Sequence, residues 1–313
     1  MTNLSEFTFL SSDGKTQLHG MLWEPEGVAV RAVLQICHGV AEHIARYDGF
    51  ARALNEQGIV VAGHDHLGHG KSLPEGGTPV YFGEGNTWNT VVDDIYILHQ
   101  RLKQRYPDVP LCIMGHSMGS FLTRTYLIRY PGTVKAAVIM GTGWQPQAAI
   151  TGGLALANAI AAVSGENATS ELVTELAFGS YNKLFAPNRT KVDWLSADES
   201  NVDDYIADPL CGADATVGLF RQMLHGIRFN QRMSHLRQMD KDMPVLFVAG
   251  DKDPVGSCGK GVRQTYDAFR AAGMRDCTLK LYPGLRHEIL NEKAYTADIT
   301  KNIEAWLLSR LEK

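Results

Sequence analysis

The sequence predicts an α/β fold in which a mostly parallel, eight-stranded sheet carries helices on both faces and a helical insertion. Short apolar segments alternate with longer amphipathic segments, which is typical of strand–helix–strand units and of strands buried on both faces. The alternation stops near Gly143 and resumes at Pro244, so the insertion lies between these residues. A chain of 313 residues is long enough to bury a large core without disulfides or metal ions.

The first two elements are predicted to form an antiparallel hairpin. Glu6–Leu10 and Gln17–Trp23 alternate in polarity and flank a turn sequence that contains Asp13 and Gly14. The strands that follow the hairpin are predicted at Ala32–Cys37, Ile59–Ala62, Pro110–Met114, Val134–Met140, Pro244–Ala249 and Thr278–Tyr282. The helices between and after them are predicted at Ile44–Gln57, Trp88–Tyr106, Ser117–Tyr130, Tyr266–Ala272 and Tyr295–Leu311.

The insertion is predicted to be a helical cap spanning residues 144–240, with residues 1–143 and 241–313 forming the core. A structureless loop of about a hundred residues is uncommon in a compact domain. Gln145–Gly165, at its start, is uncharged and long enough to cross a bilayer, but it contains glutamine, asparagine and two internal glycines. We therefore interpret this segment as a helix that covers the core and not as a membrane span.

Composition excludes several classes of protein. The 30 basic and 34 acidic side chains give a net charge of −4, and no basic run is present, so nucleic acid is not an expected partner. The five cysteines are scattered without CxxC spacing, which predicts a reducing compartment and neither disulfides nor a metal site. Residues 1–20 contain charges and lack the apolar core of a secretory signal, so we expect a cytoplasmic protein. The sequence does not predict an oligomeric state.

The strongest chemical motif is Gly115-His116-Ser117-Met118-Gly119, which directly follows a predicted strand and precedes a predicted helix. In that context GxSxG forms a sharp turn that exposes the serine at the edge of the sheet. The amide groups at the start of the helix favour a developing oxyanion. Ser117 is therefore predicted to be a nucleophile.

A nucleophilic serine needs a base and an acid that orients the base. His287 follows the strand Thr278–Tyr282, while Asp251 and Asp253 follow the strand Pro244–Ala249. Both segments therefore end at the sheet edge that carries Ser117. We predict His287 as the base and favour Asp253 as the acid, because three residues past the strand the turn can reach across, but Asp251 stays an alternative.

Two backbone amides are expected to stabilise the oxyanion. The first is the amide of Met118, the residue after the nucleophile. The second is expected in the loop after Ala32–Cys37, where Gly39 allows the backbone of Val40 to turn inward.

The segment Gly63–Ser72 contains three histidines and Asp65, a composition that also occurs in metal sites. A catalytic zinc would need further ligands from elsewhere, whereas the serine constellation is complete without a metal. We therefore expect no metal or cofactor, and we interpret the segment as a glycine-rich loop whose backbone Asp65 holds.

Five motifs in this order make the chain resemble the monoacylglycerol lipase and lysophospholipase group of α/β-hydrolases, some of whose members are described as S33-type serine aminopeptidases. The motifs are HGVAEHIARY (38–47), GHDHLGHGKS (63–72), GHSMGS (115–120), GDKDPV (250–255) and GLRHEILNE (284–292).

The resemblance implies an α/β-hydrolase fold, a triad of Ser117, Asp253 and His287, and an oxyanion hole of the Val40 and Met118 amides. It also implies that Glu42, Arg46 and His116 contact the glycerol or head-group end of the substrate. The segment 185–212 looks more like the cap of bacterial lysophospholipase-like members than that of mammalian monoacylglycerol lipases.

The expected reaction is hydrolysis of a small lipid ester through an acyl-enzyme on Ser117. Ala148–Val163 would line an acyl tunnel or serve as a core helix of the cap, and its apolar surface would suit transient contact with a membrane. A peptidase or amidase is the alternative, for which the acidic residues between Asp198 and Asp204 could bind an amino terminus. A short-chain esterase and a non-catalytic protein are further alternatives.

Overall fold

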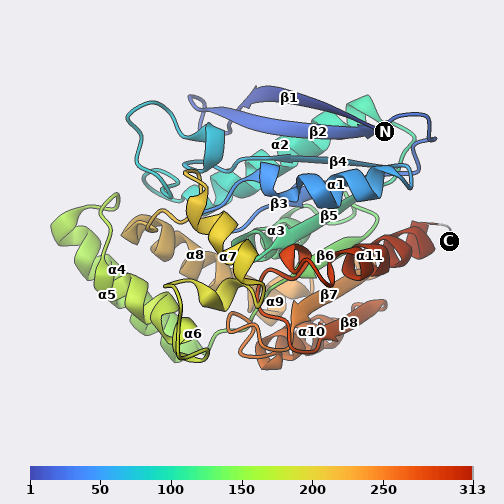
Figure 1. Ribbon diagram of the computed structural model, residues 1–313. Helices are drawn as coiled ribbons and strands as arrows, with labels where there is room; N and C mark the ends of the chain where they lie inside the picture. The colour runs from blue at the N-terminus through green and yellow to red at the C-terminus, as the bar shows by residue number, and fades with distance from the viewer. Residues whose placement is uncertain (312–313) are drawn as a thin grey trace.

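The computed structural model describes residues 1–311, and its centre is a single eight-stranded sheet (Figure 1). The strands lie in the order β1-β2-β4-β3-β5-β6-β7-β8. β2 pairs antiparallel with both of its neighbours, and the remaining neighbouring pairs are parallel. The strands are β1 Thr2–Leu10, β2 Gln17–Pro25, β3 Ala32–Cys37, β4 Ile59–His64, β5 Leu111–His116, β6 Ala137–Met140, β7 Val245–Gly250 and β8 Cys277–Tyr282.

Helices cover both faces of the sheet, as the sequence predicts. α1 (Asp48–Asn55) and α11 (Thr296–Leu311) pack on one face, where their apolar residues share a core cluster with β3 and β4. α2 (Thr87–Arg105), α3 (Met118–Arg129) and α10 (Lys260–Ala271) cover the other face. All six residues of β3, β4, β5 and β7 are buried, which explains why these strands read as unbroken apolar runs.

The chain between β6 and β7 is helical, and we call residues 144–240 the helical insertion. Its elements are α4 Gln147–Ser164, α5 Glu171–Thr174, the π-helical turn η3 Glu175–Gly179, α6 Ser180–Lys183, η4 Asp193–Leu195, α7 Glu199–Ala207, α8 Val217–Asn230 and α9 Met233–Leu236. α4 packs against α8, and α4 to α6 form an arm at one side of the molecule (Figure 1).

The two ends of the insertion are attached differently. α7 and the turn that follows it bond directly to the core: Tyr205 Oη and the Gly212 amide both donate to the Ala41 carbonyl at 3.0 Å. In contrast, α5, η3 and α6 bury little of their surface against the rest of the protein, because Val173 is the one buried residue among them.

Several predicted elements differ from the structure at their ends: β1 begins at Thr2, four residues before its predicted start, and β6 begins at Ala137, three residues after its predicted start. α10 begins at Lys260, six residues before the predicted start, because Val262, Thr265 and Phe269 bury one face while charged residues occupy the other. The predicted helix Ile44–Gln57 begins as a 3-10 turn at Ile44–Tyr47, and α1 proper ends at Asn55. The first turn of α10 was not predicted because charged residues on its exposed face interrupt the apolar pattern of the sequence.

Candidate active site

Ser117 lies on a strained turn between β5 and α3. Its φ of 55° and ψ of −122° are unusual for a residue with a Cβ. A Cβ at Gly115 would overlap the Gly119 carbonyl, and a Cβ at Gly119 would overlap the Cys37 carbonyl. The two glycines of the motif are therefore needed so that α3 can approach β3 and β5 closely.

His287 and Asp253 form a buried pair at the same edge of the sheet. His287 Nδ1 lies 3.0 Å from Asp253 Oδ1, and the two side chains are 2% and 0% exposed. The Val255 amide also donates to Asp253 Oδ1, at 2.9 Å. Asp251 does not join this pair, because its Oδ1 accepts the Gly284 amide at 2.8 Å. Of the two carboxylates considered from the sequence, Asp253 is the one in contact with His287.

Two aromatic rings lie close to the imidazole of His287. The His116 ring is 4.7 Å and the Trp194 ring 5.1 Å from it, centroid to centroid. His287 Nε2 is buried and has no hydrogen-bond partner within residues 1–311. This nitrogen is therefore free to accept a proton from a substrate or nucleophile.

The loop after β3 lies against the nucleophile. A Cβ at Gly39 would come within 3.1 Å of Ser117 Cβ, so only glycine allows this approach without displacement. Val40 follows it, and Val40, Ser117 and Met118 line the same cavity. Met118 is the first residue of α3, and the first amides of a helix have no intrahelical acceptor. The two amides expected to form an oxyanion hole thus come from segments that meet at Ser117.

Glu42, Arg46 and His116 belong to one buried ionic network. Arg46 Nη1 donates to Glu42 Oε2 at 2.8 Å and to Glu288 Oε1 at 2.7 Å. Glu42 Oε1 lies 3.2 Å from His116 Nδ1 and accepts the Gly39 amide at 2.5 Å. Glu42 thereby holds the loop that carries Val40.

The network also fixes charges. Burial alone would raise the pKa of Glu42, but the hydrogen bond with His116 and the charge of Arg46 hold it well below its usual value. Burial opposes the charged form of His116, yet Glu42 raises its pKa. Arg46 likewise lowers the pKa of Glu288 against the effect of burial.

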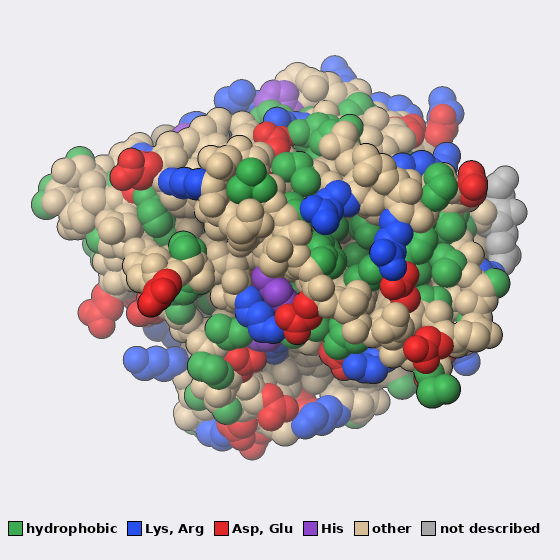
Figure 2. Space-filling view, turned by 90° about the horizontal axis from the view of Figure 1, so that it is seen from above, with side chains coloured by type: hydrophobic (Ala, Val, Ile, Leu, Met, Phe, Trp, Pro, Cys, Tyr) green, Lys and Arg blue, Asp and Glu red, His purple; other side chains and the backbone are tan. Residues whose placement is uncertain are grey.

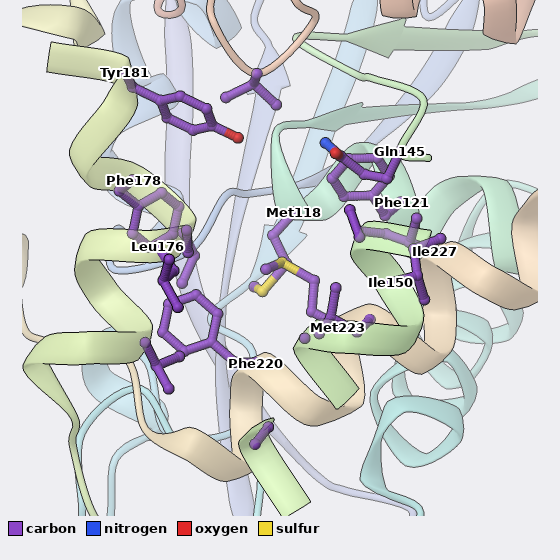
Figure 3. A pocket seen from close by; sticks show the side chains of 18 of the residues that line it. Met118, Phe121, Gln145, Ile150, Leu176, Phe178, Tyr181, Phe220, Met223 and Ile227 are labelled. Carbon is purple, nitrogen blue, oxygen red and sulfur yellow. The ribbon is translucent and has the colours of Figure 1, made fainter. Parts of the chain in front are cut away.

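A large apolar cavity of about 460 Å³ opens on one side of Ser117 (Figure 3). α4, α8 and the segment α5–α6 enclose it, and Met118 forms its inner end. Its lining includes Phe121, Ile150, Phe178, Phe220, Met223 and Ile227. One face of α4 thus lines the cavity, through Ala149, Ile150 and Leu156 among others, while most of the helix is exposed.

A second cavity, of about 250 Å³, also reaches Ser117. Ser117, Val40 and His287 line it, together with Trp194 of the insertion. Its other lining residues include the charged and polar side chains Glu42, His116, Lys191, Asp214 and Glu288. Ser117 therefore lines two cavities, and only the second of them has charged side chains in its lining, although most of its surface is apolar.

The histidine-rich segment 63–72 forms a buried loop. Asp65 accepts the amides of Ile44 and Lys71 at 2.8 and 2.9 Å and a ring nitrogen of His19 at 2.9 Å. Burial lowers the pKa of His64 and His69 to about 3. In the described part of the chain, the histidines of this segment do not form a group with metal-ligand spacing.

The acidic residues of α7 lie away from both cavities. Asp203 pairs with Arg189 at 2.7 Å, and Asp204 lies 3.7 Å from Lys293 Nζ. Neither Asp198 nor Glu199 lines the cavities that reach Ser117. These acidic residues, which could have bound the amino terminus of a peptide, therefore do not line either cavity that reaches Ser117.

Two residues of the site were not predicted. Trp194 packs beside His287 from the insertion, and no motif marks it. Glu288 pairs with Arg46 across 242 positions of the sequence. The position of Glu288 directly after His287 was the available signal. A second acidic group next to the proposed base is expected to pair with a cation, and that cation is Arg46.

The surface carries charges of both signs. Figure 2 shows lysine and arginine interspersed with aspartate and glutamate on the face seen from above. This face therefore has no extended basic patch of the kind that binds nucleic acid.

Comparisons with known proteins match this chain to hydrolases. The family model described as serine aminopeptidase, S33, matches residues 28–294. Monoacylglycerol lipase of Mycolicibacterium smegmatis is 30% identical, over 98% of each chain. Monoglyceride lipase of Mus musculus is 28% identical, over 96% of this chain and 90% of that one.

Solved structures give the same result for the whole chain. A thermostable carboxyl esterase from Bacillus coagulans, solved in complex with glycerol, superposes with a TM-score of 0.92 and is 26% identical. The match covers 99% of this chain and all of that one. A structure described as a lipase in its open form has a TM-score of 0.88 and 27% identity, with the same coverage.

Proposed function

Since the chain belongs to the serine aminopeptidase S33 family of α/β-hydrolases, we propose that it hydrolyses monoacylglycerols through an acyl-enzyme on Ser117. Two relatives matched over nearly their full length are named lipases and a third is a carboxyl esterase, and the chain is accordingly a carboxylic ester hydrolase. The observation that carries the proposal is that Ser117 lines both an apolar cavity of about 460 Å³ and a second cavity of about 250 Å³ whose lining includes charged side chains. An acyl chain fits the first and a glycerol group the second.

In the proposed mechanism Ser117 Oγ attacks the ester carbonyl, and His287 Nε2 takes its proton. Asp253 stabilises the imidazolium through Nδ1. The amides of Val40 and Met118 receive the oxyanion. Collapse of the tetrahedral intermediate breaks the bond to the alcohol, which leaves with the proton from His287. Water then repeats the sequence and releases the fatty acid.

Glu42, Arg46 and His116 are assigned to the alcohol end of the substrate. Glu42 and His116 line the second cavity, whereas Arg46 does not and is 11% exposed. Because Arg46 is held by two carboxylates, we assign it to positioning Glu42 and not to direct substrate contact.

Residues 144–240 are proposed to act as a cap over a core of residues 1–143 and 241–313, and to meet lipid surfaces. α4 is long and apolar enough to cross a bilayer, yet only 17% of it is buried. Val163, Leu172 and Leu176 on this arm are 89%, 54% and 64% exposed. An exposed apolar helix beside the acyl cavity suits a cytoplasmic enzyme that takes its substrate from a membrane surface.

The test of the function is fatty-acid release from monoacylglycerols of increasing chain length, with Ser117→Ala as the blank. Each methylene that enters the apolar cavity contributes about 0.8 kcal/mol, so kcat/KM should rise about fourfold per methylene until the cavity is full. Ser117→Ala should lower kcat by at least about 10⁴-fold. Ser117-dependent cleavage of short soluble esters with no release from monoacylglycerols would contradict the substrate but not the nucleophile. Faster release from lysophospholipids would identify these as the substrate.

Flotation with anionic lipid vesicles tests the membrane contact. Val163→Glu combined with Leu172→Glu should weaken binding and slow hydrolysis of vesicle-borne substrate, while turnover of a soluble short-chain ester stays unchanged. Val28→Glu is the matched control, because Val28 is 43% exposed on the core. Equal vesicle binding by all three proteins would refute the contact through the arm.

A further inference from the structure

A cluster of three potential ligands joins the core to the helical insertion outside the proposed catalytic site. His43 lies in the loop after β3, and Asp208 and Cys211 lie in the turn after α7. His43 Nε2 is 2.8 Å from Asp208 Oδ2, and the ligand atoms of all three residues lie within 4.8 Å of one another. Within residues 1–311 this is the one group of three or more histidine, cysteine and acidic side chains with such spacing.

We propose that His43, Asp208 and Cys211 bind a zinc ion, with water as the fourth ligand. Imidazole nitrogen, carboxylate oxygen and thiolate sulfur are the three ligand types that zinc takes in proteins. Zinc–nitrogen and zinc–oxygen bonds of about 2.0 to 2.2 Å and a zinc–sulfur bond of about 2.3 Å hold ligand atoms between 3 and 4 Å apart in a tetrahedral site.

The charges of the cluster fit a divalent cation. The Asp208 carboxylate and the Cys211 thiolate together carry two negative charges, which one zinc ion balances. The nearby Arg46 is already paired with Glu42 and Glu288, so it does not compete for these two groups. Zinc binding would displace the proton of the Cys211 thiol into solvent.

The cluster is also oriented and accessible. The Leu210 amide donates to Asp208 Oδ1 at 2.9 Å, which leaves Oδ2 directed toward His43. This bond orients the carboxylate as outer-shell hydrogen bonds do in metal sites. The His43 and Asp208 side chains are 10% and 30% exposed, and Cys211 is a half-buried free thiol. An ion can therefore reach the site from solvent.

A bound ion would reinforce an existing attachment. The Gly212 amide already donates to the Ala41 carbonyl at 3.0 Å, two residues from His43. Zinc would tie the turn 208–212 to the loop 38–43, which contains Val40. The strength with which the helical insertion is attached to the loop beside Ser117 would then depend on the concentration of free zinc.

Equilibrium dialysis against chelator-buffered zinc tests the proposal, with bound metal measured by atomic emission. The wild-type chain should bind one zinc ion, and Cys211→Ser and His43→Gln should each bind it at least about a hundredfold more weakly. Cys258→Ser is the matched control, because Cys258 is an exposed cysteine outside the cluster and its loss should leave affinity unchanged. Melting of the metal-free variants checks that each is folded.

Cobalt substitution supplies a spectroscopic signature. Tetrahedral cobalt bound to a thiolate gives a sulfur-to-cobalt charge-transfer band, which should appear in the wild-type chain and in Cys258→Ser but not in Cys211→Ser. Absence of zinc binding by the wild-type chain would overturn the proposal. Equal affinity and equal spectra for Cys211→Ser and Cys258→Ser would also overturn it, by placing the metal elsewhere.

Discussion

Replacing Asp253 by asparagine removes the one carboxylate that bonds to His287 within residues 1–311. The Asp253 side chain is 0% exposed, and its Oδ1 accepts from both the Val255 amide and His287 Nδ1. An asparagine oxygen can keep both bonds, so the variant loses the negative charge while the imidazole stays oriented. With charge centres about 4 Å apart and an effective dielectric constant of about 20, that charge stabilises an imidazolium by about 4 kcal/mol.

We therefore expect Asp253→Asn to lower kcat by about 10³-fold, close to the loss of about 10⁴-fold in a comparable triad. The assay is steady-state hydrolysis of a short-chain p-nitrophenyl ester, with active sites counted by burst titration. Asp251→Asn is the matched control, because its amide oxygen can still accept the Gly284 amide and kcat should stay within about threefold.

Two results would refute this reasoning. One is an Asp253→Asn variant that keeps more than about a tenth of the wild-type kcat. The other is a thousandfold loss in Asp251→Asn, which would identify the wrong carboxylate. Equal melting temperatures of the two variants would show that the comparison concerns catalysis and not folding.

The remaining predictions concern stability. In urea denaturation, Gly119→Ala should lower the free energy of unfolding by about 3 kcal/mol, because the new methyl group would overlap the Cys37 carbonyl. Gly49→Ala is the control: its Cβ would meet no atom within 4 Å, so the free energy of unfolding should change by less than about 1 kcal/mol. Burial would raise the pKa of Asp65, but hydrogen bonds lower it to about 2. The ionised carboxylate therefore contributes about 2 kcal/mol to the free energy of unfolding above pH 4, and this contribution is lost as the pH falls toward 2. The difference in stability between wild type and Asp65→Asn should narrow over that pH range, and a constant difference would contradict the prediction. Burial lowers the pKa of Arg124 to about 9, and no carboxylate pairs with it within residues 1–311. Arg124→Met should therefore raise the free energy of unfolding at pH 7 by about 1 kcal/mol or more, and a less stable variant would refute the view that this charge is unfavourable.

The sequence predicted most of the sheet because its strands are buried on both faces. Runs such as Ala32–Cys37 have no polar interruption beyond one glutamine and are bounded by turn residues, so their limits were predicted within a few positions. The assembly of Ser117, Asp253 and His287 near one edge was predictable for the same reason, since each follows the carboxyl end of a parallel strand.

Contacts between distant segments could not be predicted in this way. Nothing in the local pattern pairs Arg46 with Glu288 or places Trp194 beside His287, because these contacts depend on how the insertion folds back over the core. The start of α10 was missed because charged residues on its exposed face interrupt the apolar pattern of its first turn. Local patterns predict elements, whereas tertiary packing decides their partners.

The unequal attachment of the insertion implies that it does not move as one body. α7 is fastened to the core by the bonds of Tyr205 and Gly212 to Ala41, and by Asn201, whose amide donates to Glu288 at 2.8 Å. The part of the arm from residue 171 to residue 183 has little buried surface to hold it. Amide hydrogens of the arm should therefore exchange much faster than those of α7. Entry to the acyl cavity then needs only local loosening of this arm, while the proposed oxyanion loop and the proposed triad, which lie in the core, keep their geometry.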